Sequence, residues 1–248
     1  MGKKILKLAH RGYSGRYPEN TRIAFEAAVQ QTQCDGFESD VHFTKDGKLV
    51  IIHDPILDRT TNGTGFVKDY TYEELLQLDL GSWKGEEFAG QRIMLWHELL
   101  EFCRDTNKIC NLEIKNYEVF YEGIEKAVIE EIERYQMQDR VFLSSFNHVS
   151  MEACKRINPE IEVGLLYDKP LYQTAYYISR TISDCVHPRY TVLQYEPHLV
   201  EDFHKMGKKV NVWTANDGQD ILDMVNLGVD SIISNFPDRL DDLVPDPA

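Results

Sequence analysis

Short apolar runs alternate with amphipathic stretches along most of the 248-residue chain. The apolar runs predict strands at 5–10, 37–41, 49–53, 109–115, 141–144, 162–166, 185–187, 210–213 and 231–233. The amphipathic stretches predict helices at 20–33, 71–78, 96–106, 119–135, 148–157, 171–183, 196–206 and 219–227. Strands and helices that alternate in this way are typical of an α/β protein.

The number and spacing of these elements favour a closed barrel. The 49–53 strand reads as a hairpin arm, so eight βα-like units remain, and 248/8 = 31 residues is the size of one βα repeat. We therefore expect a (β/α)8 TIM barrel forming a single domain over residues 1–248. The turn-rich segment 54–91 reads as a small insertion between the strand that ends at His53 and the helix near Trp96. An open doubly wound sheet is the alternative, but no glycine-rich phosphate loop follows the first strand.

Composition narrows the possible partners. The formal charge of −14 argues against a nucleic-acid or anionic-membrane partner, because both are polyanions. Five cysteines without CxxC spacing suggest thiols in a reducing compartment, not disulfides or a zinc site. Lys7 interrupts the N-terminal apolar run, and no run approaches the roughly 20 residues that cross a bilayer. We expect a soluble cytoplasmic protein; the oligomeric state stays open.

Acidic side chains follow one face of two predicted strands. Glu38 and Asp40 share a face because side chains two apart point the same way, and so do Glu113 and Lys115. Three carboxylates in one small pocket require a counter-ion. A hard divalent cation, Ca²⁺ or Mg²⁺, suits ligands that are all oxygen. The alternative is that Arg11 and Lys115 neutralise these acids without a metal.

Two histidines each end an apolar strand beside an ionic neighbour. His10 precedes Arg11, and His53 precedes Asp54. Imidazole can take up or release a proton near neutral pH, so this pair predicts complementary proton transfer. The guanidinium of Arg11 suits an anionic oxygen such as that of a phosphate.

Other aromatic and imidazole side chains carry weaker signals. Trp213 lies at a strand end, so it suits a pocket wall as well as the core. The same indication for Phe146 is weaker. His42 lies two residues past Asp40 and could reach the rim. The remaining histidines are expected to be solvated near helices (His97, His148, His198, His204) or to belong to a strand end (His187).

Several motifs occur in an ordered series over nearly the whole chain. They are His10-Arg11-Gly12 with Pro18-Glu19-Asn20-Thr21, Gly36 to Val41, Thr44 to Gly47, His53-Asp54, Arg59-Thr60-Thr61 with Gly63 and Gly65, Leu112 to Lys115, Ser144-Ser145-Phe146, Val212-Trp213-Thr214, and Gly228 through Pro237. With this series the chain resembles the bacterial-type glycerophosphodiester phosphodiesterase family.

The resemblance implies a TIM barrel that uses one divalent cation to hydrolyse glycerophosphodiesters, such as glycerophosphocholine or glycerophosphoethanolamine. The products would be sn-glycerol 3-phosphate and an alcohol. By the family's pattern, the acid–base pair would be His10 and His53, and the metal ligands Glu38, Asp40 and Glu113. Arg11 and Lys115 would contact phosphate, and the 54–91 segment would lie near the glycerol side.

Two departures from the family's pattern concern substrate preference. Residues 93–98 read Ile-Met-Leu-Trp-His-Glu and lack the usual proline, and Ser234-Asn235 precedes Phe236-Pro237 where Thr-Asp or Thr-Asn is commoner. One rival is a phosphodiesterase that cleaves lysophospholipids in a phospholipase-D-like reaction. A rival of another class is a non-catalytic barrel scaffold. The sequence does not decide the head group, the metal, which histidine is the base, or whether water or the glycerol 2-hydroxyl attacks.

Overall fold

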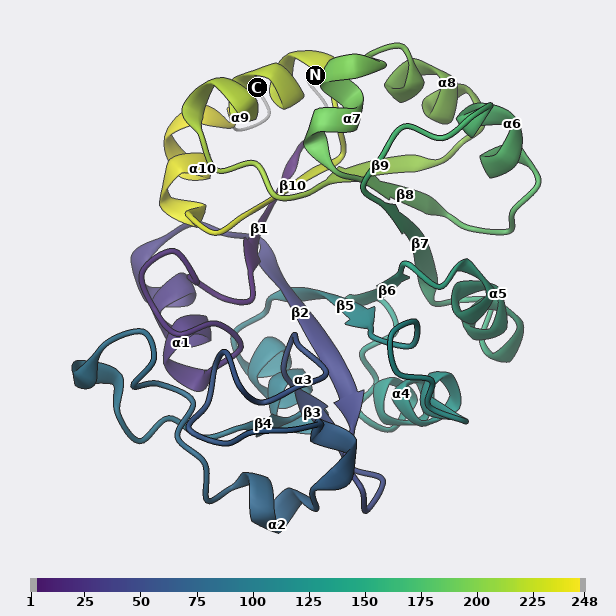
Figure 1. Ribbon diagram of the computed structural model, residues 1–248. Helices are drawn as coiled ribbons and strands as arrows, with labels where there is room; N and C mark the ends of the chain where they lie inside the picture. Colours follow the sequence, from purple (N-terminus) through teal and green to yellow (C-terminus); the bar gives the residue numbers. More distant parts are fainter. Residues whose placement is uncertain (1–3, 246–248) are drawn as a thin grey trace.

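The computed structural model describes residues 4–245, which form a closed barrel of parallel strands (Figure 1). Around the ring lie β1 (Leu6–His10), β2 (Gly36–Phe43), β5 (Ile109–Ile114), β6 (Val141–Ser145), β7 (Glu162–Tyr167), β8 (Cys185–Pro188), β9 (Lys209–Val212) and β10 (Ser231–Ser234). Strand β1 pairs in parallel with both β2 and β10, so the sheet has no free edge in this ring. The predicted (β/α)8 barrel is confirmed, and the open sheet is wrong.

Helices surround the barrel and cover the outward side chains of its strands (Figure 1). They are α1 (Arg22–Gln31), α3 (Trp96–Asp105), α4 (Ile124–Arg134), α5 (His148–Ile157), α6 (Thr174–Ser179), α7 (Tyr190–Tyr195), α8 (Leu199–Lys205), α9 (Gly218–Leu227) and α10 (Pro237–Leu243). Phe37 of β2 illustrates the packing, because its ring contacts those of Phe25 in α1 and Phe102 in α3. Burial of such side chains holds the helices against the sheet.

Several helix boundaries differ from the prediction. The helix predicted at 119–135 begins only at Ile124, because Gly123 before it has a left-handed φ of 80°. The helix predicted at 171–183 is the much shorter α6. Two helices, α7 and α10, were not predicted. Each has six or seven residues, too few for a clear helical period.

The segment after β2 forms the predicted hairpin arm and insertion. Strand β3 (Leu49–Ile51) runs antiparallel to β2, and β4 (Met94–Leu95) pairs with β3. Between them lie two 3₁₀ turns, η1 (Val67–Asp69) and η2 (Glu86–Phe88), and helix α2 (Tyr72–Leu75), which begins with a capping box formed by Thr71 and Glu74. A separate apolar cluster holds the insertion together; its buried members are Val50, Ile52, Leu57, Val67, Leu75, Leu80 and Ile93.

A buried imidazole fills part of the barrel interior. His187 of β8 is fully buried, and burial lowers its pKa to about 3, so the ring is neutral. Asn211 of β9 donates a hydrogen bond from Nδ2 to His187 Nε2 over 2.9 Å. A Cβ at Gly164 would lie 2.3 Å from the same nitrogen, so only glycine fits there. Within residues 4–245, no helix is long and apolar enough to cross a membrane.

Gly36 offers a test of how tightly β2 and β5 pack. A Cβ at this position would lie 2.1 Å from the backbone oxygen of Ile109, which cannot move without disturbing the sheet. We expect Gly36→Ala to lower the free energy of unfolding by about 2 kcal/mol or more in urea titrations. Gly218→Ala is the control, because its Cβ would meet Leu243 at an ordinary 3.5 Å. Equal stability of the two variants would contradict this packing.

Candidate active site

Three carboxylates converge in the barrel interior. Glu38 and Asp40 come from β2, and Glu113 comes from β5, whose register places Glu113 directly beside Asp40. All three side chains are buried, and one oxygen of each lies within 4.8 Å of the others. The strand period that puts Glu38 and Asp40 on one face therefore brings these three acids together.

Two basic side chains compensate part of this negative charge. Lys115 Nζ lies 3.0 Å from Asp40 Oδ1 and 2.8 Å from Glu113 Oε2, and Arg11 Nε lies 3.3 Å from Asp40 Oδ2. Burial alone would raise the pKa of Asp40, but Lys115, His53 and Arg11 hold that pKa well below its usual range. Arg11 and Lys115, which could neutralise the acids without a metal, thus both form ion pairs here. Each of them pairs with Asp40.

Glu38 lacks such a partner. Burial, and then the charge of Asp40, raise the pKa of Glu38 well above its usual range. Its Oε2 atom is buried and has no hydrogen-bond donor among the described residues. A buried acid without a partner, next to two more carboxylates, leaves room for one further positive charge. The all-oxygen donor set fits a hard cation such as Ca²⁺ or Mg²⁺.

His10 is anchored through one ring nitrogen. Its Nδ1 donates to Asn235 Oδ1 over 2.6 Å, and Ser14 Oγ donates to the same oxygen over 3.1 Å. The other nitrogen, Nε2, is therefore free of a proton in the neutral ring and lies 3.5 Å from Glu38 Oε2. Burial, and then the charge of Arg11, lower the pKa of His10 to about 3. The sequence did not predict a site role for Asn235.

His53 is anchored by a carboxylate instead. Its Nδ1 donates to Asp54 Oδ1 over 2.6 Å, and Arg59 Nε donates to Asp54 Oδ2 over 2.7 Å. Arg59 also binds both carboxylate oxygens of Glu19, over 2.7 and 2.9 Å. Glu19 in turn accepts from Arg11 over 2.8 Å. This chain of ion pairs connects Arg11, which follows His10, with the loop that carries His53. Neither Glu19 nor Arg59 was predicted as a site residue.

Nearly all of the predicted site residues line one cavity of about 150 Å³. Its polar wall contains His10, Arg11, Glu38, His53, Glu113 and Lys115, and its apolar wall contains Phe146, Leu166 and Trp213. Phe146 and Trp213 pack edge to face, with ring centroids 5.6 Å apart. Asp40 is fully buried and does not line the cavity.

Two more residues support this cavity from outside its lining, one after the end of β5 and one in β2. Tyr117, which was not predicted, donates from its hydroxyl to Glu113 Oε1 over 2.9 Å, and its ring packs on Phe146. It lies beyond the end of β5, where the strand period no longer indicates a direction. His42 does not line the cavity. Its Nε2 donates to the backbone oxygen of His53 over 3.0 Å and so helps to place that residue.

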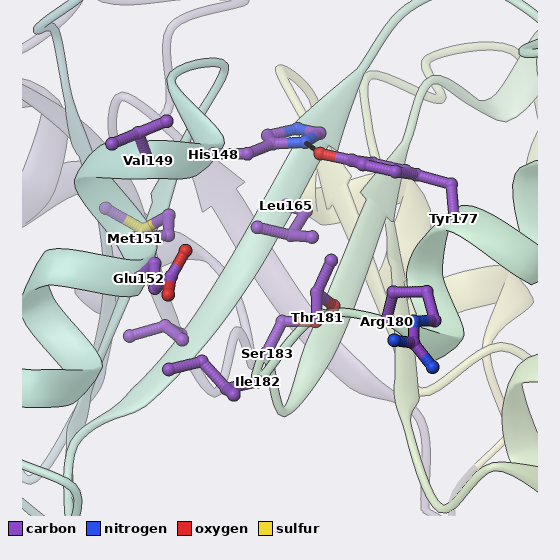
Figure 2. A pocket seen from close by; sticks show the side chains of 11 residues that line it. His148, Val149, Met151, Glu152, Leu165, Tyr177, Arg180, Thr181, Ile182 and Ser183 are labelled. Carbon is purple, nitrogen blue, oxygen red and sulfur yellow. Dashed lines mark hydrogen bonds between the residues drawn. The ribbon is translucent and has the colours of Figure 1, made fainter.

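A second groove, of about 220 Å³, lies between α5, β7 and α6 (Figure 2). Here the sequence prediction of a solvated His148 is wrong. Tyr177 donates its hydroxyl to His148 Nδ1 over 2.7 Å, and His148 Nε2 donates to the backbone oxygen of Leu166 over 2.8 Å. Both ring nitrogens are occupied, and no acidic cluster that could bind a metal occurs here in residues 4–245. The cavity inside the barrel is therefore the candidate active site.

Comparison with known proteins assigns the chain to a family. Residues 10–239 match the glycerophosphoryl diester phosphodiesterase family. A curated relative from Caldanaerobacter subterraneus, described as a glycerophosphodiester phosphodiesterase, is 44% identical over 97% of this chain and 98% of its own. The chain belongs to the glycerophosphoryl diester phosphodiesterase family and is an enzyme of that class.

Solved structures agree with the barrel. A crystal structure from Silicibacter pomeroyi superposes with a TM-score of 0.87 over 98% of this chain and 94% of that chain; at 24% identity it supports the fold alone. A phosphodiesterase from Oleispira antarctica was solved in complex with the product sn-glycerol 3-phosphate. It is 32% identical, with a TM-score of 0.86 over 96% of this chain and 95% of that chain.

The contact between Asn235 and His10 leads to a prediction about turnover. Asn235→Leu keeps the side-chain size but removes the acceptor of His10 Nδ1. We expect kcat for glycerophosphodiester hydrolysis to fall by about 10- to 100-fold with KM little changed, because the ring loses its fixed orientation. Asn158→Leu is the control, because the Asn158 amide donates to the exposed Glu133 side chain and accepts from the backbone N–H of Glu160, neither of which lines the cavity. An unchanged kcat in Asn235→Leu would show that this hydrogen bond has no positioning role.

Proposed function

We propose that the enzyme hydrolyses glycerophosphodiesters, such as glycerophosphocholine or glycerophosphoethanolamine, to sn-glycerol 3-phosphate and an alcohol. One observation carries the proposal: two histidines anchored through Nδ1 line the same small cavity as Glu38 and Glu113. A metal-dependent acid–base hydrolysis of a phosphodiester needs this combination. The Oleispira protein, solved with sn-glycerol 3-phosphate, supports the choice of substrate class.

Glu38, Asp40 and Glu113 would hold one divalent cation, Ca²⁺ or Mg²⁺. When bound, such a cation draws electron density from a phosphoryl oxygen and so favours attack at phosphorus. Arg11 and Lys115 line the same cavity and would offset charge on the remaining phosphoryl oxygens. Their partners Glu19, Asp40 and Glu113 hold both cationic groups in place before substrate binds.

The histidines would divide the proton transfers between them. Each ring uses Nδ1 for its anchor, so Nε2 is the nitrogen available to the substrate. One imidazole would take the proton of the attacking oxygen, which is water or the glycerol 2-hydroxyl. The other would give a proton to the departing alkoxide. Phe146 and Trp213 would pack against the carbon chain of the substrate.

The lysophospholipid alternative finds less support. A lysophospholipid would need an apolar surface for its acyl chain near the insertion, but Trp96, which follows that segment, is fully buried in the main core. Trp83 is 37% exposed, but Lys84 and Arg59 lie near its ring. Release of choline from glycerophosphocholine and not from lysophosphatidylcholine would separate the two functions. A cytoplasmic location remains our proposal, based on five buried cysteines without disulfides.

Metal removal tests the role of the three carboxylates. We expect a chelator to reduce release of sn-glycerol 3-phosphate by about 100-fold or more, and Ca²⁺ or Mg²⁺ to restore it. The thermal midpoint should rise when the ion is added back, because binding to the folded state alone stabilises it. Full turnover in excess chelator would refute a metal-dependent reaction.

Replacement of each histidine tests the acid–base pair. We expect His10→Ala and His53→Ala each to lower kcat by about 100- to 10 000-fold, because each variant lacks one proton transfer. Each should also lose one limb of a bell-shaped pH–rate profile. His97→Ala is the control, since His97 lies outside the cavity and stacks on Tyr135. Undiminished turnover in His10→Ala would exclude that residue from the chemistry.

A further inference from the structure

A groove of about 310 Å³ adjoins the catalytic cavity. The two spaces share His53 and Lys115, so they meet beside a proposed proton-transfer residue. Tyr117 lines the groove and packs its ring on Phe146 of the cavity wall, so its ring lies between the two spaces. A phosphodiester carries two alcohol groups on one phosphorus atom. The cavity and the adjoining groove provide a separate space for each of these groups.

The groove has a largely apolar lining. Pro55 and Ile56 come from the start of the insertion, and Phe66 pairs with Ile56 through an antiparallel bridge. Phe66 is 44% exposed and Ile56 is 37% exposed, so both side chains are accessible to a molecule in the groove. Together with the ring of Tyr117, they present carbon surface to whatever occupies the groove.

One charge in this lining is not compensated within the chain. Lys115 is paired with Asp40 and Glu113, and Asp54 is paired with His53 and Arg59. Glu118 also lines the groove, and no ion pair joins it to a cationic side chain in the described part of the chain. Aromatic faces together with a free carboxylate are the groups that recognise an alkylammonium ion.

We propose that this groove binds the leaving alcohol of the substrate and selects one that carries a quaternary ammonium group. Phe66 and Tyr117 contact the methyl groups, and Glu118 attracts the charge. The inference rests on the proposed function, in which the phosphorus–oxygen bond to this alcohol breaks and a bond to the attacking oxygen forms. The departing oxygen leaves beside His53 and gains the proton that the general acid supplies.

Three esters of sn-glycerol 3-phosphate test the proposal, with choline, 3,3-dimethylbutanol or glycerol as the alcohol. Dimethylbutanol has the shape of choline without its charge. In the wild type we expect kcat/KM for the choline ester to exceed that for the dimethylbutyl ester by about 5-fold. Glu118→Gln should bring this ratio close to one. Phe66→Ala should lower kcat/KM for both bulky esters relative to the glycerol ester.

Glu122→Gln is the matched control, because Glu122 is exposed near Glu118 in sequence but does not line the groove. It should leave the ratio unchanged. Turnover of all three esters with the same ratio in the wild type and Glu118→Gln would overturn the inference and leave the proposed function standing. Turnover of none would overturn the proposed function and, with it, the inference.

Discussion

The structure depends on how three buried carboxylates are tolerated inside the barrel. Two of them, Asp40 and Glu113, share the ammonium group of Lys115, while Glu38 has an unpartnered buried oxygen. Burying charge is costly unless it is compensated, so this cluster is difficult to explain as packing alone. A divalent cation would supply the missing charge. The same charge would draw a phosphodiester into the cavity, so compensation of the acids and proposed catalysis have a common physical origin.

Loops that are distant in sequence hold the side chains around this cluster. Glu19, in the loop after β1, binds Arg11 of the cavity wall and Arg59 in the insertion. Through Asp54, the same arginine holds His53, so the insertion and the barrel rim orient one another. On the other side, Asn235 after β10 fixes His10. The histidines therefore have unlike supports, a neutral amide for one and a charged network for the other.

Much of this arrangement follows from local sequence rules. A period of two places Glu38 with Asp40, and Glu113 with Lys115, on lumen-facing sides of their strands, and strand ends meet at one rim. The rules fail where the backbone leaves the strand. Tyr117 and Asn235 lie in loops, and only the folded path shows that they contact Glu113 and His10. The late start of α4 has a local cause in Gly123 that the helical pattern from residue 119 conceals.

Calorimetric titration of metal ions tests the central claim most directly. The account predicts that the wild type binds one Ca²⁺ or Mg²⁺ ion per chain, and that binding releases protons to solvent because the cation lowers the raised pKa of Glu38. Glu38→Gln should bind the ion at least about 10-fold more weakly, because one charged ligand is lost. Wild-type protein that hydrolyses glycerophosphodiesters but binds no divalent ion, or a Glu38→Gln variant with unchanged affinity, would contradict the account.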